Sequence, residues 1–390
     1  MKMGVVGAGV FGLASALELR GRGYHVEVFE QGGVPNPKAS STDVAKAVRR
    51  TGYGSRETYV ELAERSARGW RAIEARTGES VYHQVGLFSM VRGFRPGAPM
   101  HESRRYLASR GAKLEVLPAA EGRKRYPQFA IPDEATCVYD PWGGYIESGR
   151  AVALMARIAR EDGVTVREHT PVEAVEDGEG FAKVRTAGGP ATFDRVIVAA
   201  GPWMKRLLPE AARPITPSKQ TMVLIEPPDA SLFAHGRMPV WTYAVEESGW
   251  YGFPLLREGF VKFALGDLMN LEVNPDTDRT VGPEFAARAV EFARRHIPEL
   301  AKGRVVECRS CLYETTPDDH FLIDWVPGSQ RVLIAGGGSG HGFKFGGSIG
   351  GVIADALEGT PNTLGDLFRY GNRFEASPMP RTADQSRGFN

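Results

Sequence analysis

Apolar and polar positions alternate along this chain with two different periods, and the changes between them mark out strands and helices. An apolar run over residues 3–6 is followed by a helical pattern over residues 14–19 and by a second apolar run over residues 25–30. A strand, a helix and a second strand in such close succession are typical of the start of a parallel sheet in an α/β protein.

Three glycines separate the first strand from the helix, at Gly7, Gly9 and Gly12. In this spacing the first glycine permits a tight turn, the second lets the backbone approach a pyrophosphate, and the third lets the helix pack close to the strand. The second strand ends in Glu30, at the distance from the glycines where a carboxylate binds a ribose hydroxyl. The arrangement predicts a dinucleotide site at a helix N-terminus, without deciding between NAD and FAD.

The following patterns predict a mixture of helices and strands. Apolar spacing close to 3.6 indicates amphipathic helices over residues 56–76, with Trp70 in the core, and over residues 148–162. Between them, residues 81–90 and 113–117 alternate as strands do.

The stretch over residues 194–201 contains an apolar run, residues 196–200, and ends at Gly201. Such a run predicts a buried strand of the parallel sheet, with its carboxyl end at the ligand. Another predicted strand begins at Val172, and we expect Val172 and Gly201 to line the same cofactor site.

The pattern changes again between residues 214 and 298, where short β-segments precede a helix over residues 283–295. This change predicts a separate, sheet-bearing layer. The chain then returns to its opening character, with a strand and a glycine-rich turn over residues 331–345 and a helix over residues 348–357.

The predicted fold class is therefore α/β, with a discontinuous Rossmann-like cofactor domain and an antiparallel β-sheet substrate domain. The expected boundaries are 1–80, 146–214 and 306–372 for the cofactor domain, 81–145 and 215–305 for the substrate domain, and 373–390 for a tail.

Charge limits the partners that this chain can bind. Lys plus Arg number 48 and Asp plus Glu number 47, in 390 residues of which 42% are hydrophobic. Balanced charge gives no general field that attracts nucleic acid or an anionic membrane surface, so we expect neither partner. The sequence has no apolar run long enough to span a bilayer, which predicts a globular protein.

The three cysteines are Cys137, Cys308 and Cys311. They are too few for a disulfide framework, which makes a reducing, cytoplasmic location the default expectation. Cys308 and Cys311 form a C-x-x-C, a motif that alone suggests a redox dithiol or half of a zinc site. The sequence has no second pair for zinc, and the motif lacks the helix N-terminus that lowers a thiol pKa. We therefore expect no metal, and two small, half-buried cysteines.

A second glycine-rich turn contains Gly338, Gly340, Gly342 and Lys344. It predicts a second helix N-terminus, facing something negative or electron-rich, with an ammonium group beside it. A turn that is rich in glycine only for close packing is the competing interpretation.

Two stretches resemble the C-terminal signature of the monomeric sarcosine oxidase family of flavoenzymes. They are Cys311-Leu-Tyr-Glu-Thr-Thr-Pro-Asp-Asp-His-Phe-Leu-Ile-Asp324 and Ala335-Gly-Gly-Gly-Ser-Gly-His-Gly-Phe-Lys-Phe345. The family lies in the D-amino acid oxidase-like superfamily and includes N-methyltryptophan, pipecolate and fructosyl amino acid oxidases. The resemblance runs through most of the chain and is weakest over residues 214–239.

The resemblance implies FAD as the cofactor, joined covalently by a thioether from Cys311 to the flavin 8α-methyl group. With the glycine turns, it gives the following expected cofactor-binding residues: Gly7, Gly9, Gly12, Glu30, Lys46, Val172, Gly201, Cys311, Gly338, Gly340, Gly342 and Lys344.

The resemblance also implies catalytic residues. Arg49 and Lys344 match the pair that holds the substrate carboxylate, and Lys262 matches the lysine that helps oxygen to accept electrons. Tyr251 and His341 fall where the family lines its pocket. Without the family, the alternation of residues 261–265 would place Lys262 in water, and Tyr251 would be a core residue.

The implied reaction is the oxidation of a secondary, N-methyl or N-alkyl α-amino acid to an imine, which hydrolyses to an aldehyde and an amine. Oxygen would be reduced to hydrogen peroxide. The expected partners are thus a small amino acid and O₂, with the protein a monomer or a small homo-oligomer.

Two departures from the family pattern affect the substrate. Lys46, with Asp43 close by, stands where the family has an arginine near the flavin, as in fructosyl amino acid oxidases. The position of a pocket histidine in sarcosine oxidases falls on Gly266, which leaves more room.

Four alternatives therefore stay open. They are a fructosyl amino acid (Amadori product) oxidase, a flavin oxidase of cyclic or primary amino acids, a flavoprotein dehydrogenase that passes electrons to a protein partner, and an NAD-linked dehydrogenase.

Overall fold

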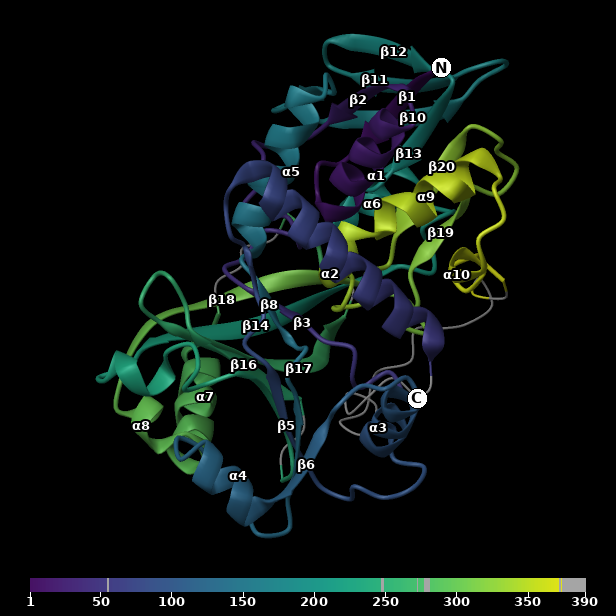
Figure 1. The fold of residues 1–390 in the computed structure, drawn as a ribbon. Helices are drawn as coiled ribbons and strands as arrows, with labels where there is room; N and C mark the ends of the chain where they lie inside the picture. The colour runs from purple at the N-terminus through teal and green to yellow at the C-terminus, as the bar shows by residue number, and fades with distance from the viewer. Residues whose placement is uncertain (55, 247–248, 272, 277–280, 372, 374–390) are drawn as a thin grey trace.

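The computed structural model describes residues 1–390 except 55, 247–248, 272, 277–280, 372 and 374–390. The predicted tail, residues 373–390, lies outside the described residues apart from Arg373. Figure 1 shows two layers of structure, with α2 (Glu57–Thr77) running between them.

The first layer is built on a six-stranded sheet. Its strands are, in order across the sheet, β19 (Leu322–Trp325), β20 (Val332–Gly336), β13 (Arg195–Val198), β1 (Lys2–Val6), β2 (His25–Phe29) and β9 (Thr165–Arg167). Every neighbouring pair is parallel except β19 with β20. Strands from both ends of the chain therefore lie side by side, which confirms the predicted α/β class with a discontinuous Rossmann-like domain.

Helices from distant parts of the sequence pack together in this layer. The α1 helix (Val10–Gly21) packs against α5 (Ser148–Glu161) and α9 (Ile349–Glu358). The contact with α9 is close, because a Cβ atom at Gly350 would lie 2.2 Å from the carbonyl oxygen of Ala14. The α2 helix buries Trp70 completely, as its pattern predicted.

A separate antiparallel sheet covers part of this layer. It consists of β10 (Val172–Asp177), β11 (Ala182–Thr186) and β12 (Gly189–Phe193). Phe193 packs edge-on against Phe29 of β2 and joins the two sheets.

The second layer contains an eight-stranded sheet. Its order is β18 (Arg304–Thr315), β14 (Thr216–Glu226), β17 (Val261–Leu271), β16 (Trp250–Leu255), β15 (Val240–Ala244), β5 (Leu87–Val91), β7 (Thr136–Asp140) and β6 (Glu115–Pro118). All neighbours are antiparallel except β15 with β5. Phe292 of α7 (Pro283–His296) stacks on Trp241 and Trp250, so this helix covers one face of the sheet.

The β18 strand connects the two layers. It pairs along its length with β14 of the large sheet, whereas its C-terminal residues reach the 3₁₀ turn η1 (Gly201–Trp203) of the first layer. The expected boundary at residue 306 thus falls inside a strand of the substrate sheet.

A small sheet lies between the layers, in the order β3 (Lys46–Val48), β8 (Gly144–Ile146) and β4 (Tyr82–His83). The remaining elements are α3 (Pro99–Ser109), α4 (Ala119–Arg125), α6 (Met204–Leu207), α8 (Pro298–Ala301), α10 (Thr363–Asp366) and the 3₁₀ turns η2 (Ala230–Phe233) and η3 (Phe343–Gly347). The sequence pattern did not predict α3, because only Ser103 and Leu107 of this helix are buried.

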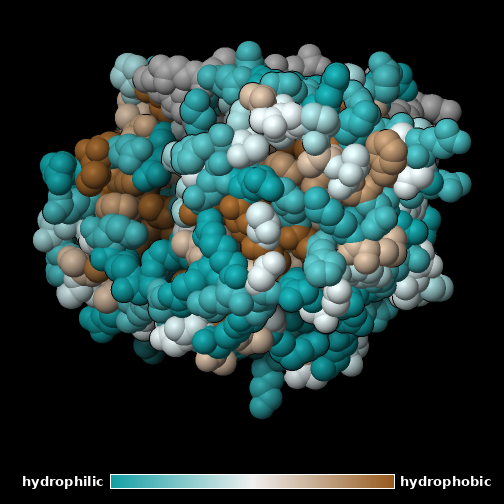
Figure 2. Space-filling view, turned by 90° about the horizontal axis from the view of Figure 1, so that it is seen from above, coloured by the Kyte–Doolittle hydropathy of each residue, from teal (hydrophilic) through white to brown (hydrophobic). Residues whose placement is uncertain are grey.

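On the face seen from above, Figure 2 shows hydrophobic residues, coloured brown, between and below protruding hydrophilic ones. None of the helices in the described part of the chain is long and apolar enough to cross a membrane.

Candidate active site

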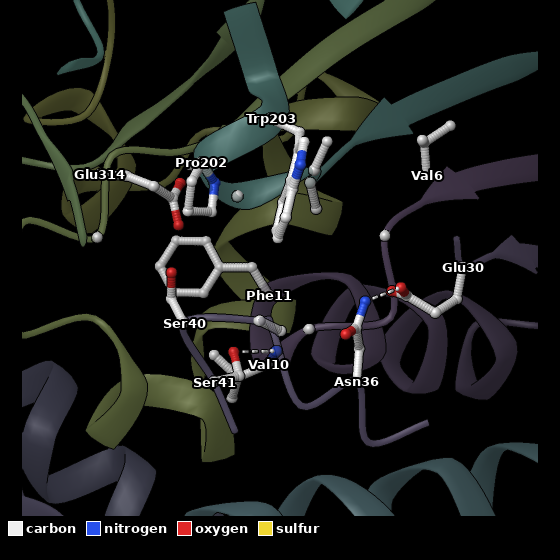
Figure 3. A pocket seen from close by; sticks show the side chains of 18 of the residues that line it. Val6, Val10, Phe11, Glu30, Asn36, Ser40, Ser41, Pro202, Trp203 and Glu314 are labelled. Atoms are coloured by element: carbon white, nitrogen blue, oxygen red, sulfur yellow. Dashed lines mark hydrogen bonds between the residues drawn. The ribbon is translucent and has the colours of Figure 1, made fainter. Parts of the chain in front are cut away.

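A cavity lies where β1, β2, β13 and β20 end, and it is lined by both glycine-rich turns. Figure 3 shows Val10, Phe11 and Ser41 on one side of it and Pro202 and Trp203 on the other. The opening of the chain and its end therefore form one site. The carboxyl ends of parallel strands are the expected place for a ligand.

The first turn requires glycine for reasons of space. Gly7 has a φ of 102°, and a Cβ atom there would lie 2.4 Å from the carbonyl oxygen of Ala199. A Cβ atom at Gly12 would lie 1.9 Å from the carbonyl oxygen of Gly7. The strand, turn and helix can approach each other this closely only without side chains. Gly7 and Gly9 line the cavity, whereas Gly12 lies behind it.

The carboxylate of Glu30 faces the cavity and is held by three donors. The backbone N–H of Ala8 donates to Oε2 at 2.9 Å, and the backbone N–H of Gly32 and Nδ2 of Asn36 donate to Oε1 at 3.0 and 2.8 Å. Figure 3 shows the bond from Asn36. These bonds fix the carboxylate at the edge of the cradle, and the sequence pattern did not single out Asn36.

The other predicted cofactor-binding residues divide into two groups. Those that line the cavity are Lys46, Val172, Gly201, Gly338, Gly340 and Gly342. Cys311 and Lys344 lie outside this lining.

The second glycine-rich turn leads to the predicted helix. The chain passes from Gly342 through the 3₁₀ turn η3, and α9 begins at Ile349, one residue after the predicted start. The cavity lining extends to Phe343, so the structure places residues of the turn at the cavity and the start of α9 against α1.

The side chains of Lys262, Asp43, Lys46 and Cys311 form one buried cluster, which we call the lysine cluster. Lys262, on β17, donates to a carboxylate oxygen of Asp43 and to the carbonyl oxygen of Ala45 at 2.7 Å. Nζ of Lys46 lies 3.2 Å from Oδ2 of Asp43 and 3.5 Å from Sγ of Cys311. Lys262 is only 1% exposed, so the expectation from alternation that it faces water is wrong.

Burial and charge act against each other in the lysine cluster. Burial lowers the pKa of Lys262 to about 8, with Asp43 opposing this change and Lys46 adding to it. Burial raises the pKa of Asp43, but the two ammonium groups outweigh it and hold that pKa well below its usual value. The pKa of Lys46 is raised, because Cys311 and Asp43 outweigh its burial. The carboxylate of Asp43 thus forms ion pairs with both Lys46 and Lys262. The lysine cluster keeps a net positive charge below about pH 8.

A second group of cations meets at the ring of Tyr53. The guanidinium carbon of Arg49 lies 4.8 Å from the ring centroid, and Nζ of Lys344 lies 5.5 Å from it. Nζ of Lys344 donates to the carbonyl oxygen of His341 at 2.6 Å. Burial, and then the charge of Arg49, lower the pKa of Lys344 well below its usual value. Within the described residues, no carboxylate forms an ion pair with Lys344, so an anion at this point would relieve the repulsion.

His341 is buried and has both ring nitrogens in hydrogen bonds. Nε2 lies 3.0 Å from the carbonyl oxygen of Asp319 and must donate, because a carbonyl can only accept. Nδ1, 3.2 Å from the hydroxyl of Tyr53, is then the acceptor. Burial, with Lys344 and Arg49, lowers the pKa of His341 well below its usual value. The geometry supports a neutral histidine that orients Tyr53.

Arg50, next to Arg49 in sequence, is held elsewhere. Its Nε and Nη2 atoms each lie 3.1 Å from an oxygen of Asp140, and Nη1 lies 3.1 Å from Oε1 of Glu64. Because Asp140 and Glu64 hold Arg50, this arginine has a structural role. Arg49 differs from it, because its guanidinium lies over the ring of Tyr53.

The predicted pocket tyrosine, Tyr251, is half-buried beside the lysine cluster. Its hydroxyl lies 3.2 Å from the hydroxyl of Tyr313. A Cβ atom at Gly266 would lie 4.0 Å from the ring of Tyr251, so the extra room expected at Gly266 is next to this tyrosine. Burial, and then Tyr313, raise the pKa of Tyr251 well above its usual value, which keeps the phenol protonated.

The three cysteines are free, and no disulfide joins the two cysteines of the C-x-x-C motif. Cys308 packs against the core cluster that contains Val223 and Phe263, whereas Cys311 packs with Met222 and Ala264. Residues three apart in a strand point to opposite faces, so the two thiols cannot meet. Among the described residues, no group of three or more His, Cys, Asp or Glu side chains is placed to hold a metal ion.

The sequence pattern missed Tyr53, Tyr313 and Glu314. Tyr53 carries no local signal, since it lies in a turn and its role depends on Arg49 and Lys344 arriving from different elements. Tyr313 and Glu314 follow Cys311 on β18, and only the position of that strand places them at the cavity.

The chain resembles a set of known proteins along nearly its whole length. The family described as FAD dependent oxidoreductase matches residues 2–356. Monomeric sarcosine oxidase from Bacillus sp. (strain NS-129) is 29% identical over 373 residues, which cover 93% of this chain and 94% of that protein. N-methyl-L-tryptophan oxidase from Yersinia pestis (strain Pestoides F) is 27% identical over 366 residues, covering 92% and 95%.

Solved structures show the same fold at lower identity. Fructosamine oxidase (Amadoriase II) from Aspergillus fumigatus superposes with a TM-score of 0.81 at 24% identity, covering 100% of this chain and 93% of that one. NikD, an amino acid oxidase of nikkomycin biosynthesis, superposes with a TM-score of 0.80 at 20% identity, covering 93% and 94%.

Proposed function

This chain belongs to the FAD dependent oxidoreductase family, and from that premise we propose that it is an oxidase of secondary α-amino acids, carrying an N-methyl or N-alkyl group. The products are an imine, which hydrolyses to an aldehyde and an amine, and hydrogen peroxide from O₂. The sarcosine and N-methyltryptophan oxidases to which the chain is similar support this proposal.

The observation that carries the proposal is the cation pair at Tyr53. Lys344 is buried, lies near Arg49 and has no carboxylate partner among the described residues. Such an arrangement is costly unless an anion completes it. A substrate carboxylate supplies that anion, and two cations fix its orientation.

The residues at the cavity fit FAD. Gly7 and Gly9 leave backbone exposed for a pyrophosphate, and Glu30 is held where a ribose hydroxyl can reach it. When bound, FAD would supply an acceptor for two electrons, with O₂ as the proposed final oxidant. We propose that Cys311 holds the cofactor covalently, as the resemblance to the sarcosine oxidase family implies, and its buried Sγ atom lies 3.5 Å from the ammonium group of Lys46, which lines the cavity.

The remaining side chains bind, orient and provide charge. Lys262, held by Asp43 and Ala45, provides a fixed positive charge where negative charge develops on oxygen. His341 has no free ring nitrogen and is therefore a positioning residue for Tyr53, not a base. The substrate amine binds in its neutral form in this scheme, so no strong base is required.

The size of the N-substituent or side chain depends on the space beside Tyr251. Gly266 contributes no side chain there, although an added Cβ atom would lie 3.3 Å from the carbonyl oxygen of Gly249, and the Asp43 and Lys46 pair resembles fructosyl amino acid oxidases. A fructosyl amino acid is therefore the second candidate substrate. Peroxide production with sarcosine, N-methyltryptophan, fructosyl-glycine, pipecolate, proline and glycine side by side tests both proposals. Activity confined to the cyclic amino acids pipecolate and proline, or to the primary amino acid glycine, would contradict them.

A dehydrogenase that passes electrons to a protein partner is the alternative from a different class. The protein is reduced by substrate under nitrogen and then mixed with air. Rapid return of the oxidised flavin spectrum with release of peroxide supports the oxidase. A flavin that stays reduced in air would favour the dehydrogenase. The oligomeric state, a monomer or a small homo-oligomer, and the cytoplasmic location stay predictions.

Replacing Arg49 with Ala should raise KM for amino acid substrates roughly 10- to 100-fold, since a hydrogen bond to a charged group contributes about 1.5–3 kcal/mol. The same substitution should have little effect on a methyl ester of the substrate, which has no carboxylate to pair. Steady-state kinetics with acid and ester provide the comparison, with the exposed Arg294 replaced by Ala as the matched control. An equal loss on acid and ester would rule out this role for Arg49.

A further inference from the structure

A second acid, Glu314, faces the cofactor cavity from β18. Figure 3 shows its carboxyl group directed toward the cavity near Pro202. A Cβ atom at Gly336 would lie 2.9 Å from Oε2 of Glu314, and one at Gly201 would lie 3.5 Å from Oε1. The carboxyl group thus fits between the ends of β13 and β20, where both neighbours are glycine.

Few groups stabilise a negative charge on the carboxyl group of Glu314. Among the described residues, its carboxyl group accepts one hydrogen bond, from the backbone N–H of Gly337, at 3.1 Å to Oε2. Within the described residues, Glu314 has no ion pair with a lysine, arginine or histidine. Glu30 in the same cavity accepts three hydrogen bonds. Burial raises the pKa of Glu314 to about 7, although the N–H of Gly337 opposes part of this change.

In the part of the chain that the structure describes, the neighbouring segments place no cation in an ion pair with Glu314. The turn at Gly201 and the α6 helix contribute Pro202 and Met204, and β20 contributes Gly336. Two cations line the same cavity, but each has an acid partner: Lys46 pairs with Asp43, and Arg206 pairs with Asp276.

FAD brings two further negative charges, on its pyrophosphate, into a cavity that already contains two carboxyl groups. An ionised Glu314 would repel them, and like charges in a poorly solvated site favour the protonated acid. A protonated carboxyl group, by contrast, donates a hydrogen bond to an oxygen acceptor. Bound FAD has such acceptors on its phosphates, its ribityl chain and its ring.

We propose that Glu314 is a cofactor-binding residue that holds FAD as the neutral acid, donating a hydrogen bond to a cofactor oxygen, so that binding of FAD is coupled to uptake of a proton. The coupling follows from the cavity, the single backbone donor and the absence of a cation partner among the described residues. It depends on FAD as the cofactor and not on the identity of the substrate.

Dissociation of FAD as a function of pH tests the proposal. The full-length Cys311→Ala holoprotein is used so that binding is reversible, and released FAD is measured by its fluorescence after dilution between pH 5.5 and 9. The Kd should be nearly constant below pH 7 and rise above it, approaching tenfold per pH unit. Calorimetric titration in two buffers of different ionisation enthalpy should show uptake of nearly one proton at pH 8.5 and of little at pH 5.5.

The Glu314→Gln variant, made in the Cys311→Ala protein, tests whether Glu314 acts as a protonated acid or as a carboxylate. An amide also donates a hydrogen bond and cannot ionise, so this variant should bind FAD with a Kd that does not change with pH and without proton uptake. Glu299→Gln, at an exposed glutamate paired with Lys302, is the control and should behave as the parent.

Three results would overturn the proposal. They are a Kd of the parent that does not change with pH, a Glu314→Gln variant that keeps the parent's pH dependence, and a folded Glu314→Gln variant that fails to bind FAD at any pH. The proton-uptake measurement needs no variant at Glu314, so a lack of proton uptake at pH 8.5 would overturn the proposal even if Glu314→Gln does not fold. No substrate is present, so a wrong substrate assignment has no effect on the outcome.

Discussion

Replacing Lys262 with Met should slow the reaction of the reduced protein with O₂ by roughly 10²- to 10³-fold, the usual effect of removing one fixed electrostatic contact to a developing charge. Lys262 is buried, and its ammonium group is held by Asp43 and the carbonyl of Ala45. A positive charge that is already oriented and shielded from water stabilises negative charge on oxygen without reorganisation. Reduction by substrate should change far less, because the proposed function assigns the substrate carboxylate to Arg49 and Lys344 and not to Lys262.

Stopped-flow measurements separate the two half-reactions. Substrate is mixed with the oxidised protein without air to follow reduction, and the reduced protein is mixed with O₂ to follow reoxidation. Lys302→Met, at an exposed lysine paired with Glu299, is the control. If Lys262→Met slowed both half-reactions equally, the role of Lys262 in the oxygen step would be disproved.

The pH dependence of reoxidation provides an independent check on Lys262. Burial lowers its pKa to about 8, so the ammonium charge is present below that pH and is lost above it. Reoxidation should therefore be fastest at low pH and decline as the pH rises through about 8. Asp43 raises the pKa of Lys262, so Asp43→Asn should move this decline to lower pH and leave the fast limit unchanged. Lys262→Met should abolish it.

Replacing Cys311 with Ala should abolish covalent attachment of the flavin completely. When the unaltered protein is precipitated with acid, the yellow colour should stay in the pellet. The Cys311→Ala protein should release free FAD into the supernatant, since no other thiol replaces Cys311. Cys308 points to the opposite face of β18, and Cys137 is fully buried in the core of the substrate layer.

The matched control for this experiment is Cys308→Ala, which removes a cysteine of the same strand without touching the site. This variant should keep its flavin in the pellet. The absorbance of the pellet and of the supernatant gives the ratio of covalently bound to released flavin. Free FAD in the supernatant of the unaltered protein would show that no thioether forms.

Local patterns predicted much of this fold. The glycine spacing at Gly7, Gly9 and Gly12 predicted a strand, a turn and a helix. Each glycine is needed because neighbouring atoms leave little or no room for a side chain there. The β-segments between residues 214 and 298 were predicted from alternation. The α3 and α4 helices were missed, because their polar surfaces provide little periodic signal.

The site was less accessible to sequence reasoning. Alternation alone placed Lys262 in water, although the side chain is buried against Asp43, more than two hundred residues earlier in the chain. Alternation reports which side of a strand a residue occupies, and not what covers that side. The covering segment around Asp43 comes from the other layer.

The sequence by itself therefore determined the α/β class, the dinucleotide cradle and, by resemblance, the flavoenzyme family and its expected residues. The tertiary structure alone decided which charges meet. It places Lys262 and Lys46 on one carboxylate, brings Arg49 and Lys344 to the ring of Tyr53, and leaves Glu314 in the cofactor cavity with one backbone donor. Glycine spacing and alternation act over a few residues, whereas the energy of a buried charge depends on neighbours that only the folded chain assembles.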